Sequence, residues 1–191
     1  IADSNAGEAS PVWSPDGAQL AYTSDDDILI HDLATDEIVQ TFTPLDHSNY
    51  LDWSPDGRSL VFVDSTRLQL IDVATGDISF LVDAGQAVLL SPAFSPDSQQ
   101  VAFGAAFAYE GTGPLAYNVV AVDVNDGALR RITDRPRNTL SPSWSPDGKH
   151  IAFWTVDPRG QYDLYIMTAD GTITRRLTDH PADDRIPQWR P

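Results

Sequence analysis

Short apolar runs separated by turn-forming residues make up most of the chain. Runs of four to seven β-branched, aromatic and aliphatic residues, such as AQLAYT at 18–23, ILIHD at 28–32 and SLVFV at 59–63, are bounded by Gly, Pro, Asp and Asn. Such runs are typical of β-strands. No window of helical length carries a 3.6-residue apolar period with capping residues. The pattern therefore predicts an all-β protein.

One motif, an aromatic residue followed by Ser-Pro-Asp, recurs four times along the chain. Its aromatic anchors Trp13, Trp53, Phe94 and Trp144 are 40, 41 and 50 residues apart, and Trp189 follows the last of them by 45 residues. A period of this length, built from short strands, is the signature of a β-propeller. The sequence thus predicts four blades, each a four-stranded antiparallel sheet, and the first strand of a fifth.

Each repeat divides into four predicted strands, running from the innermost to the outermost. They cover 10–14, 18–23, 28–32 and 37–42; then 50–54, 59–63, 68–72 and 78–82; then 90–95, 100–105, 118–123 and 128–133; and finally 141–145, 150–156, 163–167 and 173–178. We expect an N-terminal extension at 1–9 and a propeller from 10 to 191. Its blades would span 10–48, 49–89, 90–139 and 140–185, with a partial blade at 186–191.

The turns have a clear chemical origin. Proline presets φ at the second position of a tight turn, Asp accepts the next conformation, and Gly accepts a positive φ. Ser-Pro-Asp-Gly is therefore expected to close the hairpin between the first two strands of each blade. Ser98 replaces Gly in the third copy, which predicts a distorted or strained turn there, and Asp36 replaces Gly in an outer hairpin. We expect the aromatic anchors on the innermost strands to pack between neighbouring blades.

Composition excludes several classes of function. Acidic residues outnumber basic ones by 28 to 12, giving a net charge of −16, so nucleic acid is a poor candidate partner. The absence of cysteine excludes disulfides, thiolate nucleophiles and thiolate zinc sites. No apolar run reaches transmembrane length, and IADSNAGEAS at 1–10 does not resemble a signal peptide. We expect no membrane insertion and no cofactor.

Binding residues of a propeller are expected in the loops at the mouth of the central channel. Loops between blades carry His47, His180, Arg135, Arg137 and Arg185. A further loop at 106–117 is an insertion of about ten residues that carries Tyr109 among glycines, and it is either a partner-contact loop or a lengthened hairpin. These six residues are the predicted partner-binding set, with a protein or peptide as the partner.

A second hypothesis is a carbohydrate-related or ligand-binding propeller that holds a divalent ion between His47, His180 and Asp184. Converging His and carboxylate ligands would be required, although no spacing demands that they converge. The acidic runs at 25–27 and 183–184 match no EF-hand spacing. No Gly-x-Ser-x-Gly elbow and no phosphate-binding glycine loop occurs, so we predict no catalytic residues.

The repeats resemble those of the TolB-type β-propeller, a WD40-like repeat. The fourth repeat carries the resemblance most fully, with WSPDG at 144–148, HIAF at 150–153, DLYIM at 163–167, ADG at 169–171 and RRLT at 175–178. The resemblance covers residues 10–190 and implies a bacterial, periplasmic or extracellular scaffold that binds proteins without catalysis. Relatives of this kind also include propellers attached to prolyl-oligopeptidase-like enzymes and to sensors, which remain alternatives.

The number of repeats departs from this family, whose propellers usually have six to eight blades. Three explanations remain open. The chain is a fragment of a larger propeller; or it pairs with a second copy through open blade edges, two half-rings making one ring; or it is a small ring closed by an atypical last strand.

Overall fold

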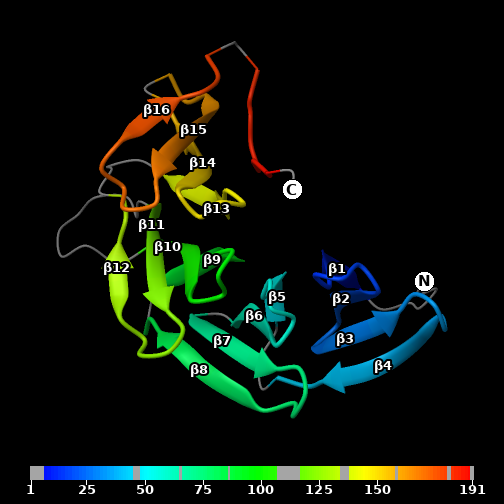
Figure 1. Ribbon diagram of the computed structural model, residues 1–191. Helices are drawn as coiled ribbons and strands as arrows, with labels where there is room; N and C mark the ends of the chain where they lie inside the picture. Colours follow the sequence, from blue (N-terminus) through cyan, green and yellow to red (C-terminus); the bar gives the residue numbers. More distant parts are fainter. Residues whose placement is uncertain are drawn as a thin grey trace.

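The computed structural model describes residues 7–44, 48–64, 66–85, 87–106, 117–133, 138–157, 159–179 and 182–189. These residues form sixteen β-strands and no helix, and so contain no helix long and apolar enough to cross a membrane. The strands make four antiparallel sheets of four strands each, arranged side by side in an open arc (Figure 1). The predictions of an all-β fold and of propeller blades are confirmed.

Each blade is a meander whose strands follow chain order from the centre of the arc outward. Blade 1 contains β1 (Glu8–Trp13), β2 (Gln19–Ser24), β3 (Asp27–Asp32) and β4 (Glu37–Phe42); blade 2 contains β5 (Ser48–Trp53), β6 (Ser59–Asp64), β7 (Arg67–Asp72) and β8 (Ile78–Asp83); blade 3 contains β9 (Val88–Phe94), β10 (Gln100–Ala106), β11 (Tyr117–Asp123) and β12 (Leu129–Arg131); blade 4 contains β13 (Thr139–Trp144), β14 (His150–Val156), β15 (Tyr162–Thr168) and β16 (Thr174–Arg176). The innermost strands β1, β5, β9 and β13 lie next to one another in that order.

The Ser-Pro-Asp turns owe their rigidity to the serine side chain. In blade 2 the Ser54 hydroxyl donates to Asp56 Oδ1 at 2.7 Å and accepts from the Ser59 amide at 2.8 Å. Gly57 takes the positive φ of 76° that the turn requires. Ser98 occupies the same position in blade 3 with a φ of 60° and keeps the turn hydrogen bond to the Ser95 carbonyl at 2.9 Å. The replacement of Gly therefore strains the backbone without distorting the turn.

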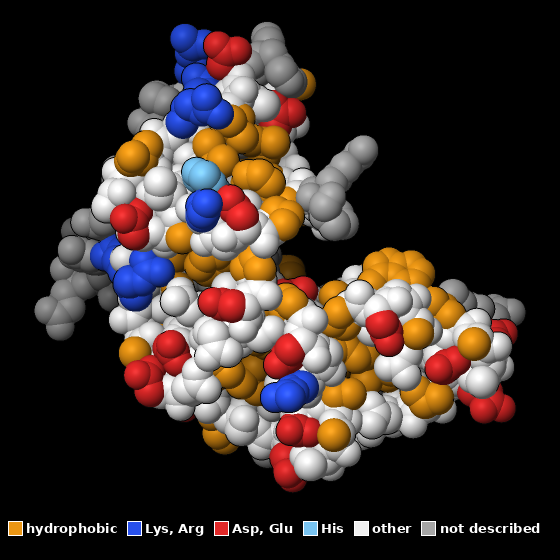
Figure 2. Space-filling view, viewed as in Figure 1, with side chains coloured by type: hydrophobic (Ala, Val, Ile, Leu, Met, Phe, Trp, Pro, Cys, Tyr) orange, Lys and Arg blue, Asp and Glu red, His pale blue; other side chains and the backbone are white. Residues whose placement is uncertain are grey.

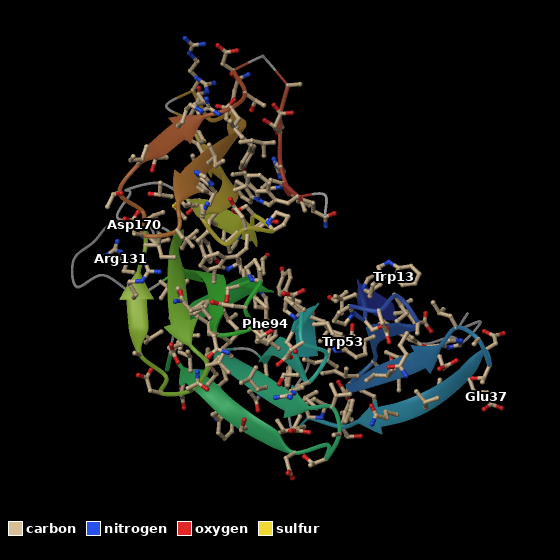
Figure 3. All side chains as sticks on the ribbon, in the orientation of Figure 1. Trp13, Glu37, Trp53, Phe94, Arg131 and Asp170 are labelled. Atoms are coloured by element: carbon tan, nitrogen blue, oxygen red, sulfur yellow. The ribbon has the colours of Figure 1, made fainter. Side chains whose placement is uncertain are left out.

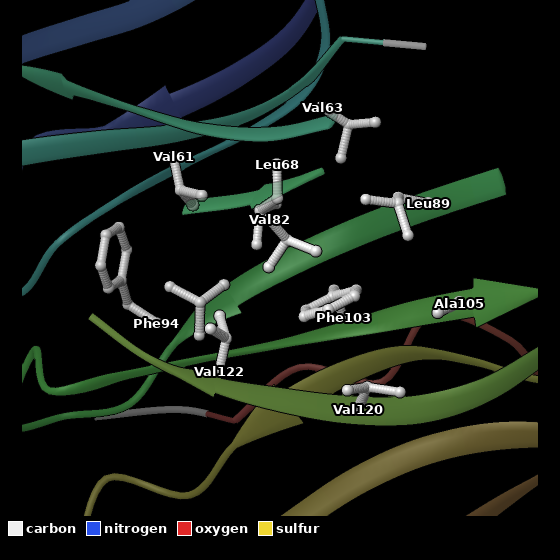
Figure 4. Close-up of a cluster of buried hydrophobic side chains, with 11 residues drawn as sticks. Val61, Val63, Leu68, Val82, Leu89, Phe94, Phe103, Ala105, Val120 and Val122 are labelled. Carbon is white, nitrogen blue, oxygen red and sulfur yellow. The ribbon is translucent and has the colours of Figure 1, made fainter. Parts of the chain in front are cut away.

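The hydrophobic core lies between the blades. We call the face of a blade that carries its aromatic anchor the leading face, and the opposite face the trailing face. The leading face of blade 3, with Phe94 and Phe103, packs on the trailing face of blade 2, with Val61, Val63 and Leu68 (Figure 4). Similar clusters join blade 1 to blade 2 and blade 3 to blade 4. Each interface follows from the alternation of side chains along a strand, which gives every blade two apolar faces.

One aromatic anchor departs from the prediction that all of them pack between blades. Trp53 and Phe94 are each 6% exposed, whereas Trp13 is 60% exposed. Figure 3 shows Trp13 at the free end of the arc, while Trp53 and Phe94 lie within it. The reason is positional, because no blade of the described part of the chain precedes blade 1 and covers its leading face.

Candidate binding channel

The innermost strand of every blade contains a bulge at the same place. In each blade, two residues of the innermost strand oppose a single residue of the neighbouring strand. The pairs are 10–11 in β1, 50–51 in β5, 91–92 in β9 and 141–142 in β13. The opposing residue is always aromatic, namely Tyr22, Phe62, Phe103 and Phe153. A bulge leaves residues outside the ladder and bends the strand. The inner wall of the arc therefore includes, in every blade, two residues that do not take part in regular strand pairing.

The first residue of each bulge has a positive φ. The values are 52° for Ser10, 55° for Tyr50, 50° for Ser91 and 51° for Ser141, and Ile186 in the segment after blade 4 has 56°. Four of these five residues precede a proline, and the exception is Tyr50, which precedes Leu51. A non-glycine residue with positive φ is uncommon, and such strain is often found at functional sites. Its recurrence at each repeat marks it as a built feature of the inner wall.

Together the bulges line a channel with a volume of about 330 Å³. Its walls carry serine hydroxyls, proline rings, the half-exposed phenol of Tyr50 and the carboxyl group of Asp52. The full described lining is Ser10, Pro11, Val12, Tyr50, Leu51, Asp52, Ser91, Pro92, Ala93, Ser141, Pro142, Ser143, Ile186, Pro187 and Gln188. Asp52 is the only carboxylate in this described lining, and no Lys, Arg or His belongs to it.

Hydrogen bonds between blades hold the lining in place. Ser10 Oγ of blade 1 accepts from the Tyr50 amide of blade 2 at 3.1 Å. Ser141 Oγ of blade 4 lies 3.5 Å from Ser91 Oγ of blade 3 and accepts from Trp154 Nε1 at 3.1 Å. Each serine thus serves both the wall of the channel and a contact behind it, which makes the wall rigid rather than loop-like.

Asp52 is the unusual member of the channel wall. The equivalent positions in the other repeats hold Val12, Ala93, Ser143 and Gln188, none of which ionises. Its Oδ2 accepts from the Phe94 amide of the next blade at 2.7 Å. Burial raises the pKa of Asp52 to about 7, because the charged form loses more solvation than the hydrogen bonds return. Near neutral pH this carboxyl group can therefore either donate or accept a proton in a hydrogen bond.

The chemistry of the channel suits an extended polypeptide better than a small charged ligand. Serine hydroxyls and backbone groups near the bulges offer both donors and acceptors, while the proline rings and Tyr50 offer flat apolar contact. The described lining includes no cation to hold a phosphate or carboxylate group. Among the described residues, no group of three or more His, Asp or Glu side chains is placed to hold a metal ion.

Most of the partner-binding residues predicted from the sequence cannot be placed. Five of the six lie outside the described residues, namely Tyr109, Arg135, Arg137, His47 and His180. The inserted loop at 107–116 also lies outside them. The contact role of these residues therefore remains a prediction. The metal hypothesis is in the same position, because two of its three ligands, His47 and His180, lie outside the described part.

Arg185 is the one predicted contact residue that the structure describes. Its guanidinium lies 3.5 Å from the ring centroid of Tyr162 and 5.8 Å from that of Trp154, and it donates to Asp183 Oδ2 at 3.0 Å. These contacts fix the segment that enters the channel at Ile186–Gln188. Stacked cations of this kind contribute roughly 0.5–1 kcal/mol at exposed sites, so Arg185 has a stabilising role whether or not it touches a partner.

The channel residues Tyr50 and Asp52 were missed by the sequence analysis, although two signals point to them. A proline stands two residues before an aromatic anchor in four repeats, as Pro11, Pro92, Pro142 and Pro187. A proline at a fixed place in an inner strand indicates a bulge. The acidic side chain of Asp52 also interrupts an otherwise uncharged stretch of β5. Both signals become visible when the repeats of the chain are aligned with one another.

Comparison with protein families and solved structures agrees with this geometry. The family model described as PD40, TolB beta propeller domain, matches residues 64–191, more than half of the chain. The Tol-Pal system protein TolB of Anaeromyxobacter dehalogenans strain 2CP-C is 36% identical over 104 residues, 54% of this chain and 22% of that protein. The uncharacterized peptidase YuxL of Bacillus subtilis is 28% identical over 100 residues, 52% of this chain and 15% of that protein.

A solved structure described as a TolB from Agrobacterium tumefaciens superposes with a TM-score of 0.79 at 24% identity. The superposition covers 96% of this chain and 66% of that one. At this identity the match shows the fold. The chain spans about a fifth of the length of the TolB sequence that it matches and 66% of the solved structure, so each of these proteins contains polypeptide beyond the matched part.

Proposed function

Because the chain belongs to the TolB beta propeller domain family, we propose that it is a non-catalytic interaction module that holds an extended segment of a partner protein in its central channel. The observation that carries this proposal is the row of bulges, which removes inner-strand residues from regular pairing and presents them along one channel. Extended peptides bind where backbone groups and shallow side-chain pockets alternate.

Tyr50 in the bulge of β5 and Asp52 next to that bulge define how recognition would work. Tyr50 provides an amphipathic ring, which is 42% exposed, and Asp52 provides the one ionisable carboxyl group of the described wall. Tyrosine supplies large contact area at low entropic cost, and a partly desolvated carboxylate favours a donor or a cation. The partner segment we propose therefore carries a basic or amide side chain directed at Asp52. Flanking parts of the partner, which include acidic residues, are contacted by the six residues predicted from the sequence, namely Arg135, Arg137, Arg185, His47, His180 and Tyr109.

The experiment is selection of short linear peptides from a phage-displayed random library, followed by titration of the enriched peptides. Tyr50→Ala and Asp52→Asn should each weaken binding by about tenfold or more, corresponding to roughly 1.4 kcal/mol. Ile173→Ala, at an outer position that is 67% exposed, is the matched control and should leave binding unchanged. Peptides that bind the two channel variants and the parent equally would contradict a channel site.

The arginines of the predicted contact set need a separate variant. Replacing both Arg135 and Arg137 by Ala should weaken only those peptides that carry Asp or Glu, because each loses a charge-assisted hydrogen bond. Unchanged affinity for acidic peptides would remove these two residues from the site and leave the channel proposal intact. By family resemblance, we also propose that the protein acts in the periplasm or outside the cell.

A second candidate function follows from the similarity to the peptidase YuxL, which covers 52% of this chain. In that case the four blades are the propeller part of a larger enzyme, and the channel receives a substrate on its way to a catalytic domain. Purified chain should not cleave fluorogenic peptides under either proposal. The two differ because a substrate path would bind many unrelated peptides weakly, whereas a scaffold would select a defined motif.

A further inference from the structure

A cavity separate from the channel opens between blades 3 and 4, and we call it the turn cavity. It lies between residues 95–97 and 146–148 of two Ser-Pro-Asp turns, and Arg130 of blade 3 and Asp170 of blade 4 also line it. Its volume of about 490 Å³ is in the range of roughly 300–1,000 Å³ that is usual for small-ligand sites. It shares no described lining residue with the channel. In the space-filling view, acidic, basic and hydrophobic side chains lie together where these two blades meet (Figure 2).

A single residue determines whether the turns of neighbouring blades are joined. Ser98 Oγ of blade 3 accepts from the Asp56 amide of blade 2 at 3.1 Å, which ties those two turns together. Gly148 stands at the place of Ser98 in blade 4 and has no side chain to make such a bond. Its φ of 68° is close to the 60° of Ser98, and Pro96 Cδ, at 3.9 Å, is the only described atom within 4 Å of an added Cβ. The turn cavity is therefore open where a serine is absent and a serine would fit.

Trp144 brings an aromatic surface and an unpaired donor to the lining. It is partly exposed, whereas Trp53 and Phe94, at the same place in blades 2 and 3, are each 6% exposed. Trp53 Nε1 donates to the Gly57 carbonyl at 3.2 Å, while Trp144 Nε1 is buried and has no hydrogen-bond partner in the described part of the chain. A buried donor without a partner is costly, so an oxygen atom that a ligand brings to it would be favourable.

Three carboxylate groups of the lining each keep one oxygen for a ligand. Oδ1 of Asp97, Asp147 and Asp170 accepts from a Ser or Thr hydroxyl of its own turn at 2.5–2.6 Å. No described residue donates to the Oδ2 atoms of these three side chains. The hydroxyl bonds lower the pKa values of all three carboxyl groups, that of Asp170 to about 2, so all three are charged at neutral pH. The lining therefore offers three unpaired acceptors.

Arg130 and Gln100 add donors to the same lining. Arg130 donates through Nη1 and Nη2 to the Ala169 carbonyl at 3.2 Å, and Nη2 lies 3.4 Å from Gln100 Oε1. These bonds leave Arg130 Nε and Gln100 Nε2 without an acceptor among the described residues. An anionic ligand would be repelled by three carboxylates, whereas an ammonium group has no acceptor for these donors or for the indole. A hydroxyl group both donates and accepts, and suits the whole lining.

The corresponding groove between blades 1 and 2 lacks this combination. It is of similar size, about 560 Å³, and Gln40 takes the place of Arg130 there, donating to the Val73 carbonyl at 2.8 Å. Its described lining contains one carboxylate, that of Asp72, and neither an indole nor a proline ring. The chemistry of the turn cavity is therefore particular to blades 3 and 4 and is not a general property of the repeat.

We propose that the turn cavity binds an uncharged saccharide unit, either free or within a longer glycan. The sugar hydroxyls donate to the three free carboxylate oxygens and accept from the indole N–H of Trp144, from Arg130 and from Gln100. The apolar C–H face of the sugar packs against the indole and the proline rings of the lining. The site is separate from the channel, so it does not depend on the peptide proposal.

The experiment is a screen of the full chain on an array of neutral and charged glycans, followed by calorimetric titration of the saccharides that bind. A neutral saccharide should bind with a Kd of about 1 mM or tighter. Titration with the free saccharide and with a polymer that contains it distinguishes a soluble ligand from a glycan chain. Tyr50→Ala, which alters the channel, should leave saccharide binding unchanged.

Nitrogen-15 NMR of the tryptophan indoles provides a readout that a change in stability alone would not produce. The chain contains five tryptophans, and Trp144→Phe assigns the signal of Trp144 with the residue that blade 3 has at this place. Saturating saccharide should shift the Trp144 indole signal and leave those of Trp13 and Trp154 in place. A saccharide that shifts only other indole signals binds elsewhere and overturns the proposal.

The first variant closes the cavity. Gly148→Ser reproduces the serine of blade 3 and should weaken saccharide binding by at least about tenfold, because its side chain occupies the opening between the turns. Gly57→Ser is the matched control, since it places a serine at the equivalent turn of blade 2 with a similar φ of 76°, and it should bind as the parent does.

Two further variants remove single groups of the lining. Arg130→Gln copies Gln40, which keeps the carbonyl bond between blades, and should weaken binding by about tenfold through loss of the guanidinium. Asp170→Asn should have a similar effect, because it removes a charged acceptor while its amide oxygen preserves the turn. Asp126→Asn, at the equivalent turn of blade 3 and outside the turn cavity, should leave binding unchanged.

Two results would overturn the proposal. One is that no saccharide on the array binds the parent, or that Gly148→Ser and Asp170→Asn bind it as tightly as the parent does. The other is that spermidine binds and saccharides do not, which would assign the turn cavity to a cationic ligand. The midpoints of thermal unfolding of all variants establish that each comparison is made between folded proteins.

Discussion

The Asp52 carboxylate on β5 accepts a 2.7 Å hydrogen bond from the Phe94 amide on β9, 42 residues further along the chain. This contact joins the innermost strands of blades 2 and 3 at the wall of the channel. It also places an ionisable group where the other repeats have none. Stability and channel chemistry are therefore linked through one residue.

The first prediction concerns the pH dependence of stability. Burial raises the pKa of Asp52 to about 7 from an ordinary value of 3.8. Between these values the folded protein keeps a proton that the unfolded chain has lost, so the free energy of unfolding falls as pH rises. Asp52→Asn should remove this slope and be more stable than the parent above pH 7, by up to about 4 kcal/mol. Urea unfolding across this range provides the measurement.

Exposed Asp179 supplies the control, since Asp179→Asn should leave the slope unchanged. The turn carboxylates act in a different range. Hydrogen bonds from Ser14, Ser95 and Ser145 lower the pKa values of Asp16, Asp97 and Asp147 below 3.8, so their stabilisation is present above that pH and is lost only on stronger acidification. A slope that persists in Asp52→Asn would show that another group dominates.

The second prediction compares two glycines with the same backbone conformation. Gly17 has a φ of 71°, and no described atom lies within 4 Å of the position that an added Cβ would take, so Gly17→Ala should cost about 1 kcal/mol from backbone strain alone. Gly171 has a φ of 80°, and an added Cβ would meet the Ile132 carbonyl oxygen of blade 3 at 2.5 Å. Gly171→Ala should cost about 3 kcal/mol in chemical denaturation. Equal costs would mean that blades 3 and 4 separate easily at this point.

The third prediction concerns a buried carboxylate. Asp163 is 0% exposed and accepts a 2.7 Å hydrogen bond from Arg176 Nη2 at the edge of blade 4. Arg176→Ala should lower the thermal unfolding midpoint, because it leaves the buried Asp163 carboxylate without its cation. The neighbouring Arg175→Ala should have little effect, since Arg175 is exposed and its side chain makes no hydrogen bond or ion pair with a described residue. The thermal unfolding midpoints of the two variants decide between these expectations.

The fourth prediction tests the turn that defines the repeat. The Ser54 hydroxyl is buried and both donates to Asp56 and accepts from the Ser59 amide. Ser54→Ala leaves that amide unsatisfied and should cost about 1–2 kcal/mol. Ser79→Ala, which removes an exposed hydroxyl, should be neutral within about 0.5 kcal/mol. If both variants unfold at the same urea concentration, the hydroxyl contributes less than its geometry implies.

Most of the fold could be predicted from the sequence because each repeat encodes its own sheet. The alternation in 59–63 and 150–156 specifies which side chains are buried, and Ser-Pro-Asp at each anchor specifies where the hairpin turns. The observed strands, such as Ser59–Asp64 and His150–Val156, end within a few residues of the predicted ones. The sequence pattern of one repeat is therefore sufficient to predict those strands that pair with the next strand in the chain.

The features that could not be predicted depend on contacts with neighbouring blades, which the sequence of a single repeat does not encode. Trp13 and Trp53 stand in identical WSPDG motifs, yet one is 60% exposed and the other 6%, because only Trp53 has a blade in front of it. The raised pKa of Asp52 likewise comes from burial in the assembled blades, against which the hydrogen bond from the Phe94 amide acts, and the local sequence of β5 encodes neither effect. Five of the six predicted contact residues lie in loops outside the described part, and their role awaits the peptide experiments.

The bulge opposite Tyr22, Phe62, Phe103 and Phe153 has a consequence for how such a protein can change. In blades 2, 3 and 4 the aromatic ring behind the bulge lies in the packing between blades, while the first residue of the bulge lines the channel. Substitution at Tyr50, whose side chain is half-exposed, can therefore alter what the channel accepts with little effect on the packing between blades. The division allows new partners to be acquired by exchanging a few side chains per repeat, on a framework that need not adapt.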